Sequence, residues 1–264
     1  MAGYYYPARA QPLSEALEAL LASAPAPDPA SATAVVLPHG SFRHCGRIIA
    51  ATLGRVAVPR RCILIGASHT GSAMRWSLMP GGAYQTPLGA VPVDEAAAEA
   101  LRARCPFLEP DAWAQRGEHS VEVLLPFLQR LAPSDLAIVP IVTSSEEPEQ
   151  LRQLGEALAQ VIRLQEEAVL PIASAELSHE KPVERARGRD EETIRAICAL
   201  DVPRLTRLTE EDGASLCGYG ALAAILQAAT ALGARGGTLC GYGTSADAGG
   251  DPDSAIGYAG VLIR

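Results

Sequence analysis

The sequence lacks the features that mark membrane, secreted and nucleic-acid-binding proteins. No apolar run reaches about eighteen residues, so no segment is predicted to cross a bilayer. The N-terminus has no basic segment followed by an apolar core, which argues against a secretory signal. The net charge is −8 and there is no basic stripe, which argues against nucleic acid or an acidic membrane surface as a partner. We therefore expect a cytoplasmic protein with no nucleic-acid or membrane partner.

The chain also lacks the patterns of several common catalytic sites. It has no CxxC pair, and its six scattered cysteines are expected to be reduced thiols. There is no GxxxxGKS/T phosphate loop and no HExxH zinc motif. Ser68 is not part of a GxSxG elbow, so serine hydrolysis is disfavoured. Only Cys217 has a specific functional interpretation, because it precedes Gly218 at an expected helix start, where exposed amides favour a thiolate.

Apolar strands and helical segments alternate along the chain. Buried strands are expected at 34–37, 62–65, 136–142 and 168–173, short strands or a hairpin within 84–93, and closing strands at about 237–242 and 256–262. Helices are expected from Ser14, at 47–53, after Asp94, over 117–128 with a break near Pro126, at about 147–164 and 189–208, and from near 216; a linker is expected at 24–29. This alternation predicts an α/β protein, a single domain over 1–264 with a largely parallel central sheet flanked by helices.

Four of the five histidines lie where a strand meets a loop or where a helix begins. His39 and His69 each follow a buried strand, and we expect those two strands to be adjacent. A lone histidine in such a place is more often a structural hydrogen-bonding residue than a ligand. Loops at the carboxyl ends of parallel strands share a crevice, however, and several imidazoles delivered there favour a zinc, copper or iron site. Ligands from separate loops also leave an open coordination position, as a catalytic metal requires.

Carboxylates accompany two of the other histidines. Glu118 and His119 lie at an expected helix start, and Glu122 lies about one turn beyond His119. Either Glu118 complements the helix dipole and His119 is a surface residue, or His119 and Glu122 form a pair at the metal or behind its ligands. Glu176-x-x-His179 follows the strand at 168–173 and should point into the same crevice. A carboxylate beside a histidine either orients a ligand or takes part in proton transfer.

Motifs in order across almost the whole chain resemble the Memo family, also called AmmeMemoRadiSam system protein B. The family's AGxWYP-like opening is similar to Ala2–Pro7, its PHAGYxYxG motif to Pro38–Gly46, and its GPSHH to Gly66–Thr70. Its TPLG with a following aspartate resembles Thr86–Gly89 and Asp94, its SSDxSH resembles Ser174–His179, and its CG resembles Cys217 with Gly218. The most specific motif, EHSxExxLPFL, is matched by Glu118–Leu128.

This resemblance implies a fold akin to the class III extradiol dioxygenases of the catechol-cleaving type. By position it implies that His39, His69 and Cys217 hold a metal, Fe(II) first and copper or zinc as alternatives. It also places three further residues at the site as acid/base or supporting groups, namely His119, Glu176 and His179. Family context suggests partner proteins of the radical-SAM or AMMECR type.

The chain departs from the family pattern at the wall of the expected site. Glu176 replaces the family aspartate, and Thr70 replaces the second histidine of GPSHH. Tyr5 replaces the family tryptophan, and Phe42 and His44 replace the tyrosines of the first loop. The implied ligands are intact while the wall is altered, which suggests a divergent subgroup with a substrate of its own.

We therefore expect a mononuclear non-haem iron oxidoreductase that activates O2 against a small-molecule or modified-peptide substrate. Its acid/base groups would be His119, His179 and Glu176. One alternative is a non-catalytic adaptor whose cleft binds metal or peptide, and a weaker one is a zinc hydrolase, because the same ligands suit zinc.

Overall fold

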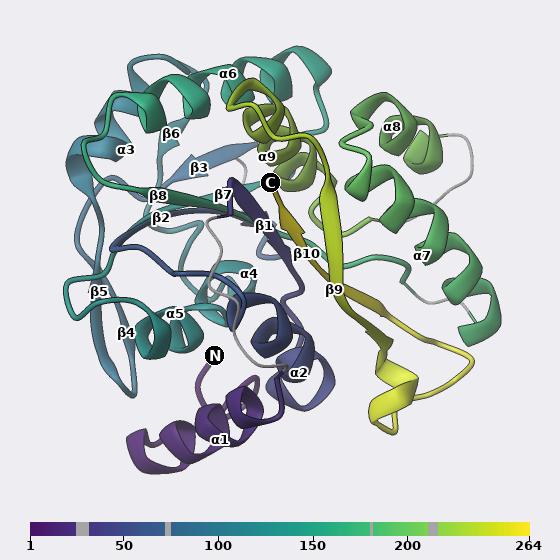
Figure 1. The fold of residues 1–264 in the computed structure, drawn as a ribbon. Coiled ribbons are helices and arrows are strands. Elements are labelled where there is room, and N and C mark those ends of the chain that lie inside the picture. Colours follow the sequence, from purple (N-terminus) through teal and green to yellow (C-terminus); the bar gives the residue numbers. More distant parts are fainter. Residues whose placement is uncertain (25–31, 72–74, 180–181, 211–215) are drawn as a thin grey trace.

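A computed structural model describes residues 1–24, 32–71, 75–179, 182–210 and 216–264 (Figure 1). The linker predicted at 24–29 lies outside the described residues apart from Ala24. No helix within the described ranges combines the length and the apolarity that a bilayer crossing requires.

The centre of the molecule is an eight-stranded sheet in the order β6-β3-β7-β2-β8-β1-β10-β9. Its middle is parallel, and consists of β7 (Ala137–Thr143), β2 (Arg61–Ala67), β8 (Val169–Ser174) and β1 (Ala34–Leu37). These strands are buried along nearly their whole length, because helices cover both faces, and this explains their continuous apolar sequences. The predicted α/β architecture with a largely parallel central sheet is confirmed.

Antiparallel strands extend the sheet on both sides. On one side β10 (Gly257–Ile263) pairs with β1 and with the edge strand β9 (Gly237–Thr244), and the 3-10 turn η1 (Ser245–Ala248) follows β9. On the other side β3 (Trp76–Leu78) pairs with β7 and carries the short edge strand β6 (Glu109–Pro110). The hairpin of β4 (Ala83–Thr86) and β5 (Gly89–Pro92) forms a separate two-stranded sheet, as the sequence predicted.

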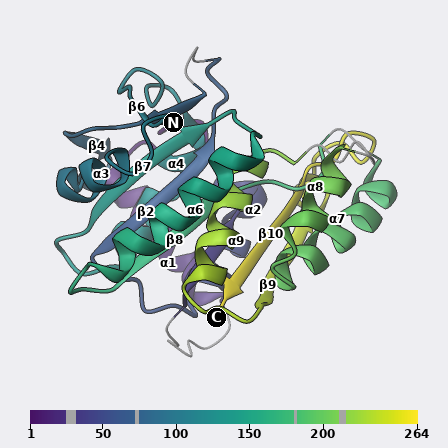
Figure 2. The ribbon, with the colours of Figure 1, turned by 90° about the horizontal axis from the view of Figure 1, so that it is seen from above.

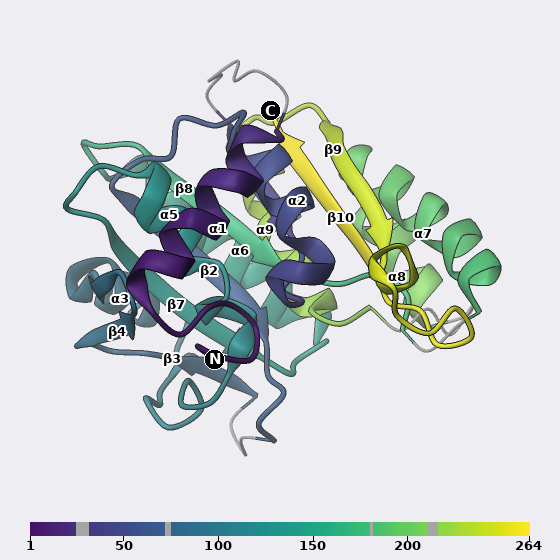
Figure 3. The same cartoon turned by 90° about the horizontal axis from the view of Figure 1, so that it is seen from below.

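Helices form a layer on each face of the sheet (Figures 2 and 3). One layer contains α3 (Glu95–Arg102), α6 (Pro148–Arg163), α7 (Val183–Cys198), α8 (Val202–Glu210) and α9 (Tyr219–Ala231). The other contains α1 (Ala10–Ala22), α2 (Phe42–Leu53), α4 (His119–Glu122) and α5 (Leu125–Leu131). α9 is buried on almost every side, because it packs against the sheet, α6 and α8, which explains its largely apolar sequence.

Several helix boundaries differ from those predicted. α2 begins at Phe42 instead of Arg47, because Ser41 is extended at the N-cap and Phe42 and Cys45 already face the core at helical spacing. α1 begins at Ala10, four residues before Ser14. The helical stretch predicted at 189–208 begins at Val183 and is interrupted between α7 and α8, where Leu200 adopts a φ of 57°.

The break predicted near Pro126 is confirmed. α4 ends at Glu122 and α5 begins at Leu125, with the proline in the first turn of α5. A proline in the first turn loses no intrahelical hydrogen bond, so the residue starts the second helix and does not kink a continuous one.

Candidate metal centre

Three strands of the parallel part of the sheet deliver the site residues at the same offset. His39 lies two residues beyond the end of β1, His69 two beyond the end of β2, and Glu176 two beyond the end of β8. The sequence suggested that the strands preceding His39 and His69 are adjacent. This prediction is wrong, because β8 lies between them. Because β8 lies between β1 and β2, Glu176, which follows β8, lies between the loops that carry His39 and His69.

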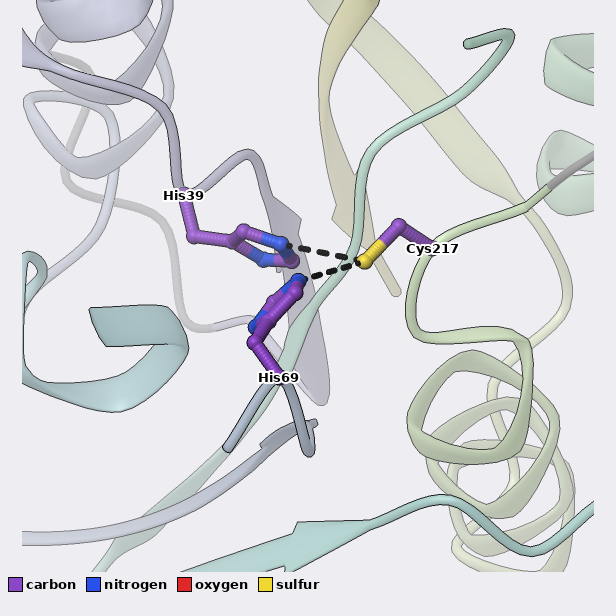
Figure 4. A group of neighbouring side chains, drawn as sticks. All are labelled: His39, His69 and Cys217. Atoms are coloured by element: carbon purple, nitrogen blue, oxygen red, sulfur yellow. Dashed lines mark hydrogen bonds between the residues drawn. The ribbon is translucent and has the colours of Figure 1, made fainter. Parts of the chain in front are cut away.

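The side chains of His39, His69 and Cys217 point at one another (Figure 4). The Sγ of Cys217 is 3.0 Å from the Nε2 of His69 and 3.5 Å from the Nε2 of His39. All three of these donor atoms lie within 4.8 Å of one another. The structure therefore brings together the three residues that the sequence placed around a metal.

Cys217 reaches the site through a tight turn at the start of α9. The next residue, Gly218, caps α9 with a φ of +89°, a left-handed conformation that favours glycine. A Cβ at this position would lie 2.6 Å from the backbone oxygen of Ser174. In addition, the carbonyl of Cys217 accepts a hydrogen bond from the backbone N–H of Glu176 at 2.9 Å. Cys217 is thereby fixed against the end of β8.

His39 and His69 are each oriented through the other ring nitrogen, Nδ1. The hydroxyl of Ser174 donates to the carbonyl of Ser120 at 2.5 Å, so its Oγ, 2.9 Å from the Nδ1 of His39, accepts the Nδ1 proton. The carboxylate of Glu118 accepts from the Nδ1 of His69 at 2.8 Å. Both imidazoles therefore direct a Nε2 lone pair towards Cys217. Partners of this kind set the tautomer and the ring orientation of metal-binding histidines.

Glu118 is fully buried and pairs with His69, while its Oε1 also lies 3.5 Å from the Nδ1 of His119. Its carboxylate also accepts the backbone N–H groups of His69 at 2.5 Å and of Ser120 at 2.8 Å. Burial alone would raise the pKa of Glu118, but these hydrogen bonds outweigh it and lower the pKa to about 2. In the sequence Glu118 is only the neighbour of His119. Its hydrogen bond to His69 could not be predicted, because nothing in the sequence indicates that the segments carrying Glu118 and His69 meet.

His39 and His69 have opposite electrostatic environments. Complete burial lowers the pKa of His39 to about 4, because the charged imidazolium would lose its hydration. Burial also acts to lower the pKa of His69, but hydrogen bonds to Cys217 and Glu118 outweigh it and raise the pKa to about 10. His39 is thus held in the neutral form that a metal ligand requires.

The predicted acid/base residues line the same site. An oxygen of Glu176 lies 3.0 Å from the Nε2 of His179 and 3.9 Å from the Nε2 of His39. Glu176 is buried, which acts to raise its pKa, but the nearby His39 and His179 outweigh this effect and lower the pKa. His119 stacks on Tyr5, with ring centroids 4.6 Å apart, and its ring centroid is 4.2 Å from that of His69.

The interpretation of Glu122 as a partner of His119 at the metal is not supported. The carboxylate of Glu122 instead accepts a hydrogen bond from the hydroxyl of Tyr6 at 2.6 Å, which holds the N-terminal segment against α4. That contact explains how Tyr5, the neighbour of Tyr6, comes to lie on His119. The carboxylate therefore acts on the wall of the site and not on the ligands.

Comparison with known proteins shows the family of this chain. The family model described as Memo-like protein matches residues 1–262. The chain belongs to the Memo family. It is 32% identical to a MEMO1 family protein, MK0963, of Methanopyrus kandleri over 100% of this chain and 97% of that protein. It is equally 32% identical to a MEMO1 family protein of Aquifex aeolicus, over 100% and 97%, and 34% identical to one of Methanococcoides burtonii, over 87% and 85%.

The residues at which this Memo-family chain departs from the family pattern have partners of their own. His44 lies in the first turn of α2, with its Nδ1 3.0 Å from the hydroxyl of Ser41, and so belongs to a helix and not to a loop. The hydroxyl of Thr70 donates to the carbonyl of Ala114 at 3.4 Å. Among the described residues, the imidazole of His44 is not in any of the groups whose donor atoms converge.

The donor set of the Memo-family chain fits a transition metal. Two imidazoles and one thiol come from three separate loops, and both imidazoles are oriented by acceptors that belong to the protein. Imidazole and thiolate together suit iron, copper and zinc. His39, His69 and Cys217 would hold the ion, and three ligands leave coordination positions open.

Proposed function

We propose that this Memo-family protein is a mononuclear non-haem iron oxidoreductase that activates O2 against a small or peptide-derived substrate. The observation that carries the proposal is the convergence of the Nε2 atoms of His39 and His69 on the thiol of Cys217, with both Nδ1 atoms held by protein acceptors. An Fe(II) ion bound there would supply open positions that bind and polarise O2 and substrate.

Around such an ion, the protein itself would orient the ligands and control their protonation. Ser174 holds the proton on the Nδ1 of His39, and Glu118 holds the proton on the Nδ1 of His69. Burial keeps His39 neutral, because its pKa is lowered to about 4. Neither imidazole therefore needs to rotate or change tautomer in order to offer its Nε2.

Proton transfer is assigned to Glu176 and His179. The carboxylate of Glu176 lies 3.0 Å from the Nε2 of His179, so it can hold a proton on that nitrogen and orient the ring. The same carboxylate lies 3.9 Å from the Nε2 of His39, which places the pair directly beside the ligand cluster. His119 is a second candidate for proton transfer, with its ring covered on one face by Tyr5.

The test begins with elemental analysis of protein purified without oxygen, followed by O2 consumption with catecholic and peptide-derived substrates. The proposal predicts iron at one equivalent and O2 uptake that is lost in Cys217→Ala and retained in Cys240→Ala, a substitution of a half-buried cysteine in β9. Iron without O2 uptake on any such substrate would contradict the oxidoreductase proposal. Zinc at one equivalent would favour a hydrolase, and peptide binding that survives metal removal would favour an adaptor.

A further inference from the structure

Besides Glu118 and Glu176, a third buried carboxylate lies behind the site, on a helix that carries none of the three proposed ligands. Asp190 is in the middle of α7 and has no exposed surface. Its Oδ1 accepts the backbone N–H of Ser178 at 2.9 Å, and its Oδ2 accepts the hydroxyl of Tyr242 at 2.7 Å. Asp190 thereby joins α7 and β9 to the residue that immediately precedes His179.

The segment Ala175–His179, here called the Glu176 loop, is held along its length by backbone hydrogen bonds. The N–H of Ala175 donates to the carbonyl of Leu37 at 2.9 Å, and the N–H of Leu177 donates to the carbonyl of Gly257 at 2.8 Å. The N–H of Glu176 donates to Cys217, as described above. The N–H of Ser178 is the next one along the loop, and a side chain, that of Asp190, accepts it.

The fold leaves space for this carboxylate at Gly257. A Cβ on Gly257 would lie 2.0 Å from the Oδ2 of Asp190, so any larger residue there would displace the carboxylate. The backbone of Gly257 in turn binds the loop on both sides, since its N–H donates to the carbonyl of Ser178 at 2.9 Å and its carbonyl accepts from Leu177. The glycine, the carboxylate and the loop therefore fit together only in this arrangement.

Asp190 accepts one backbone amide and one phenol, and an uncharged side chain could accept hydrogen bonds there as well. Removing its charge from water costs free energy, and a neutral side chain would accept the same hydrogen bond at lower cost. What a carboxylate adds is a shorter, stronger and more directional charge-assisted bond. Such a bond is useful where a loop must hold its side chains in one position, which is the case beside Glu176 and His179.

We propose that Asp190 is a positioning residue, which fixes the Glu176 loop so that Glu176 and His179 stay paired beside the ligand cluster. This inference rests on the proposed function only for the acid/base role of that pair. His39 and His69 follow other strands, so loss of Asp190 should disturb the pair and spare the ligand histidines.

The test compares Asp190→Ala, Asp190→Asn and Tyr242→Phe in the full chain. Amide hydrogen exchange is read at Leu177, Ser178 and Gly257, and in β2 as the reference. The ring nitrogen resonances of His179, assigned with His179→Gln, report its pairing with Glu176. Co(II) binding, followed by the thiolate charge-transfer band, reports the ligand cluster.

In Asp190→Ala, amide exchange at Leu177, Ser178 and Gly257 should rise at least tenfold and the His179 resonances should shift. Exchange in β2 and the Co(II) band should stay unchanged. Asp190→Asn should give a smaller change in the same direction, because its amide oxygen still accepts the Ser178 N–H but lacks the charge that strengthens the bond. Tyr242→Phe should have little effect, because it leaves that bond in place.

An equal rise of exchange in the loop and in β2 would reduce Asp190 to a general stabiliser and overturn the proposal, and so would unchanged exchange at Ser178. If Asp190→Ala does not fold, Asp190→Asn decides alone: a shifted His179 signal with unchanged β2 exchange supports the proposal, and an unshifted signal overturns it. Absence of a Co(II) band in the wild type would contradict the proposed function instead, since the exchange and imidazole measurements need no metal.

Discussion

His39 and His69 both stand two residues beyond the end of a strand, yet the surroundings of the two imidazoles differ. His39 is completely buried and is paired through Nδ1 with a neutral hydroxyl, that of Ser174. The side chain of His69 is 33% exposed and is paired with the ionised carboxylate of Glu118. The fold therefore buries the His39 end and gives its Nδ1 a neutral partner, whereas the His69 end is partly open to solvent and its Nδ1 has a charged partner.

This difference indicates a division of tasks between the two ends. At the His39 end, burial excludes the proton that would compete with a metal, as the pKa lowered to about 4 shows. At the His69 end, Glu118 supplies negative charge that raises the basicity of the ligand and partly balances the charge of a cation. The four predictions that follow test this division, from the largest expected effect to the smallest.

Cys217→Ser should have the largest effect, because the thiol is the donor that both histidine ends share. We expect metal affinity to fall by more than about 100-fold, since loss of a ligand should exceed the effect of losing a partner behind one. Competition with a chromogenic chelator would measure the change, with Cys240→Ser as the matched control. Equal affinities for the two variants would mean that the metal does not use this thiol.

Glu118→Gln should come next, with a loss of metal affinity of about 10- to 100-fold, the usual range for a partner of a ligand histidine. The amide keeps the size of the side chain, removes its charge and replaces one acceptor oxygen by a donor, so the result measures what the two carboxylate oxygens contribute at the His69 end. The same chelator competition would measure it. An affinity within about twofold of wild type would show that the carboxylate only orients the ring.

The stability of the metal-free protein should depend on pH in opposite senses at the two ends. The pKa of His39 is about 4 in the folded protein and 6.5 for an ordinary histidine. The contribution of His39 to folding stability is therefore present above pH 6.5 and is lost as the pH falls towards 4. The folded pKa of His69 is raised to about 10, so its contribution is present below pH 6.5 and is lost as the pH rises towards 10. We expect maximal stability near pH 6.5.

Urea unfolding in the presence of a chelator would test this profile. His39→Asn should flatten the acid side and Glu118→Gln the alkaline side. On the acid side Glu118 adds a second loss, since its folded pKa of about 2 lies below 4.5 and its contribution disappears between those values. If both variants changed the pH dependence of stability in the same way between pH 4.5 and 10, the proposed difference between the His39 and His69 ends would be refuted.

Ser174→Ala should have the smallest effect on metal affinity, about threefold, because it removes a neutral hydrogen bond from a ring that burial already holds. It leaves the Nδ1 proton of His39 and the carbonyl of Ser120 without this partner, so stability should fall by about 1–3 kcal/mol. Chelator competition and thermal unfolding would measure the two effects. A larger loss of affinity than in Glu118→Gln would reverse the comparison.

The strands and the histidines that follow them could be predicted because their signals are local. A continuous apolar run that ends in a histidine turn is visible in the sequence, and β1 with His39 and β2 with His69 were both found in this way. The position of β8 between them could not be found, because strand order depends on how helices cross the sheet, and no residue in either strand encodes it.

The partners behind the ligands also required the structure. Glu118 and His69 are 49 positions apart, and Ser174 and His39 are 135 apart. Asp190 is similarly hidden, since in the sequence it is one more charged residue of a polar helix. Each of these residues acts through a contact between elements that are distant in the chain, whereas periodicity and motif spacing report only on neighbours.

The most direct test of the metal centre is X-ray absorption spectroscopy on protein loaded anaerobically with one equivalent of Fe(II). The central claim is that His39, His69 and Cys217 together bind this ion. We expect one sulfur and two imidazole nitrogens around the metal, and loss of the sulfur signal in Cys217→Ser. A coordination shell of nitrogen and oxygen alone, unchanged by that substitution, would contradict the claim.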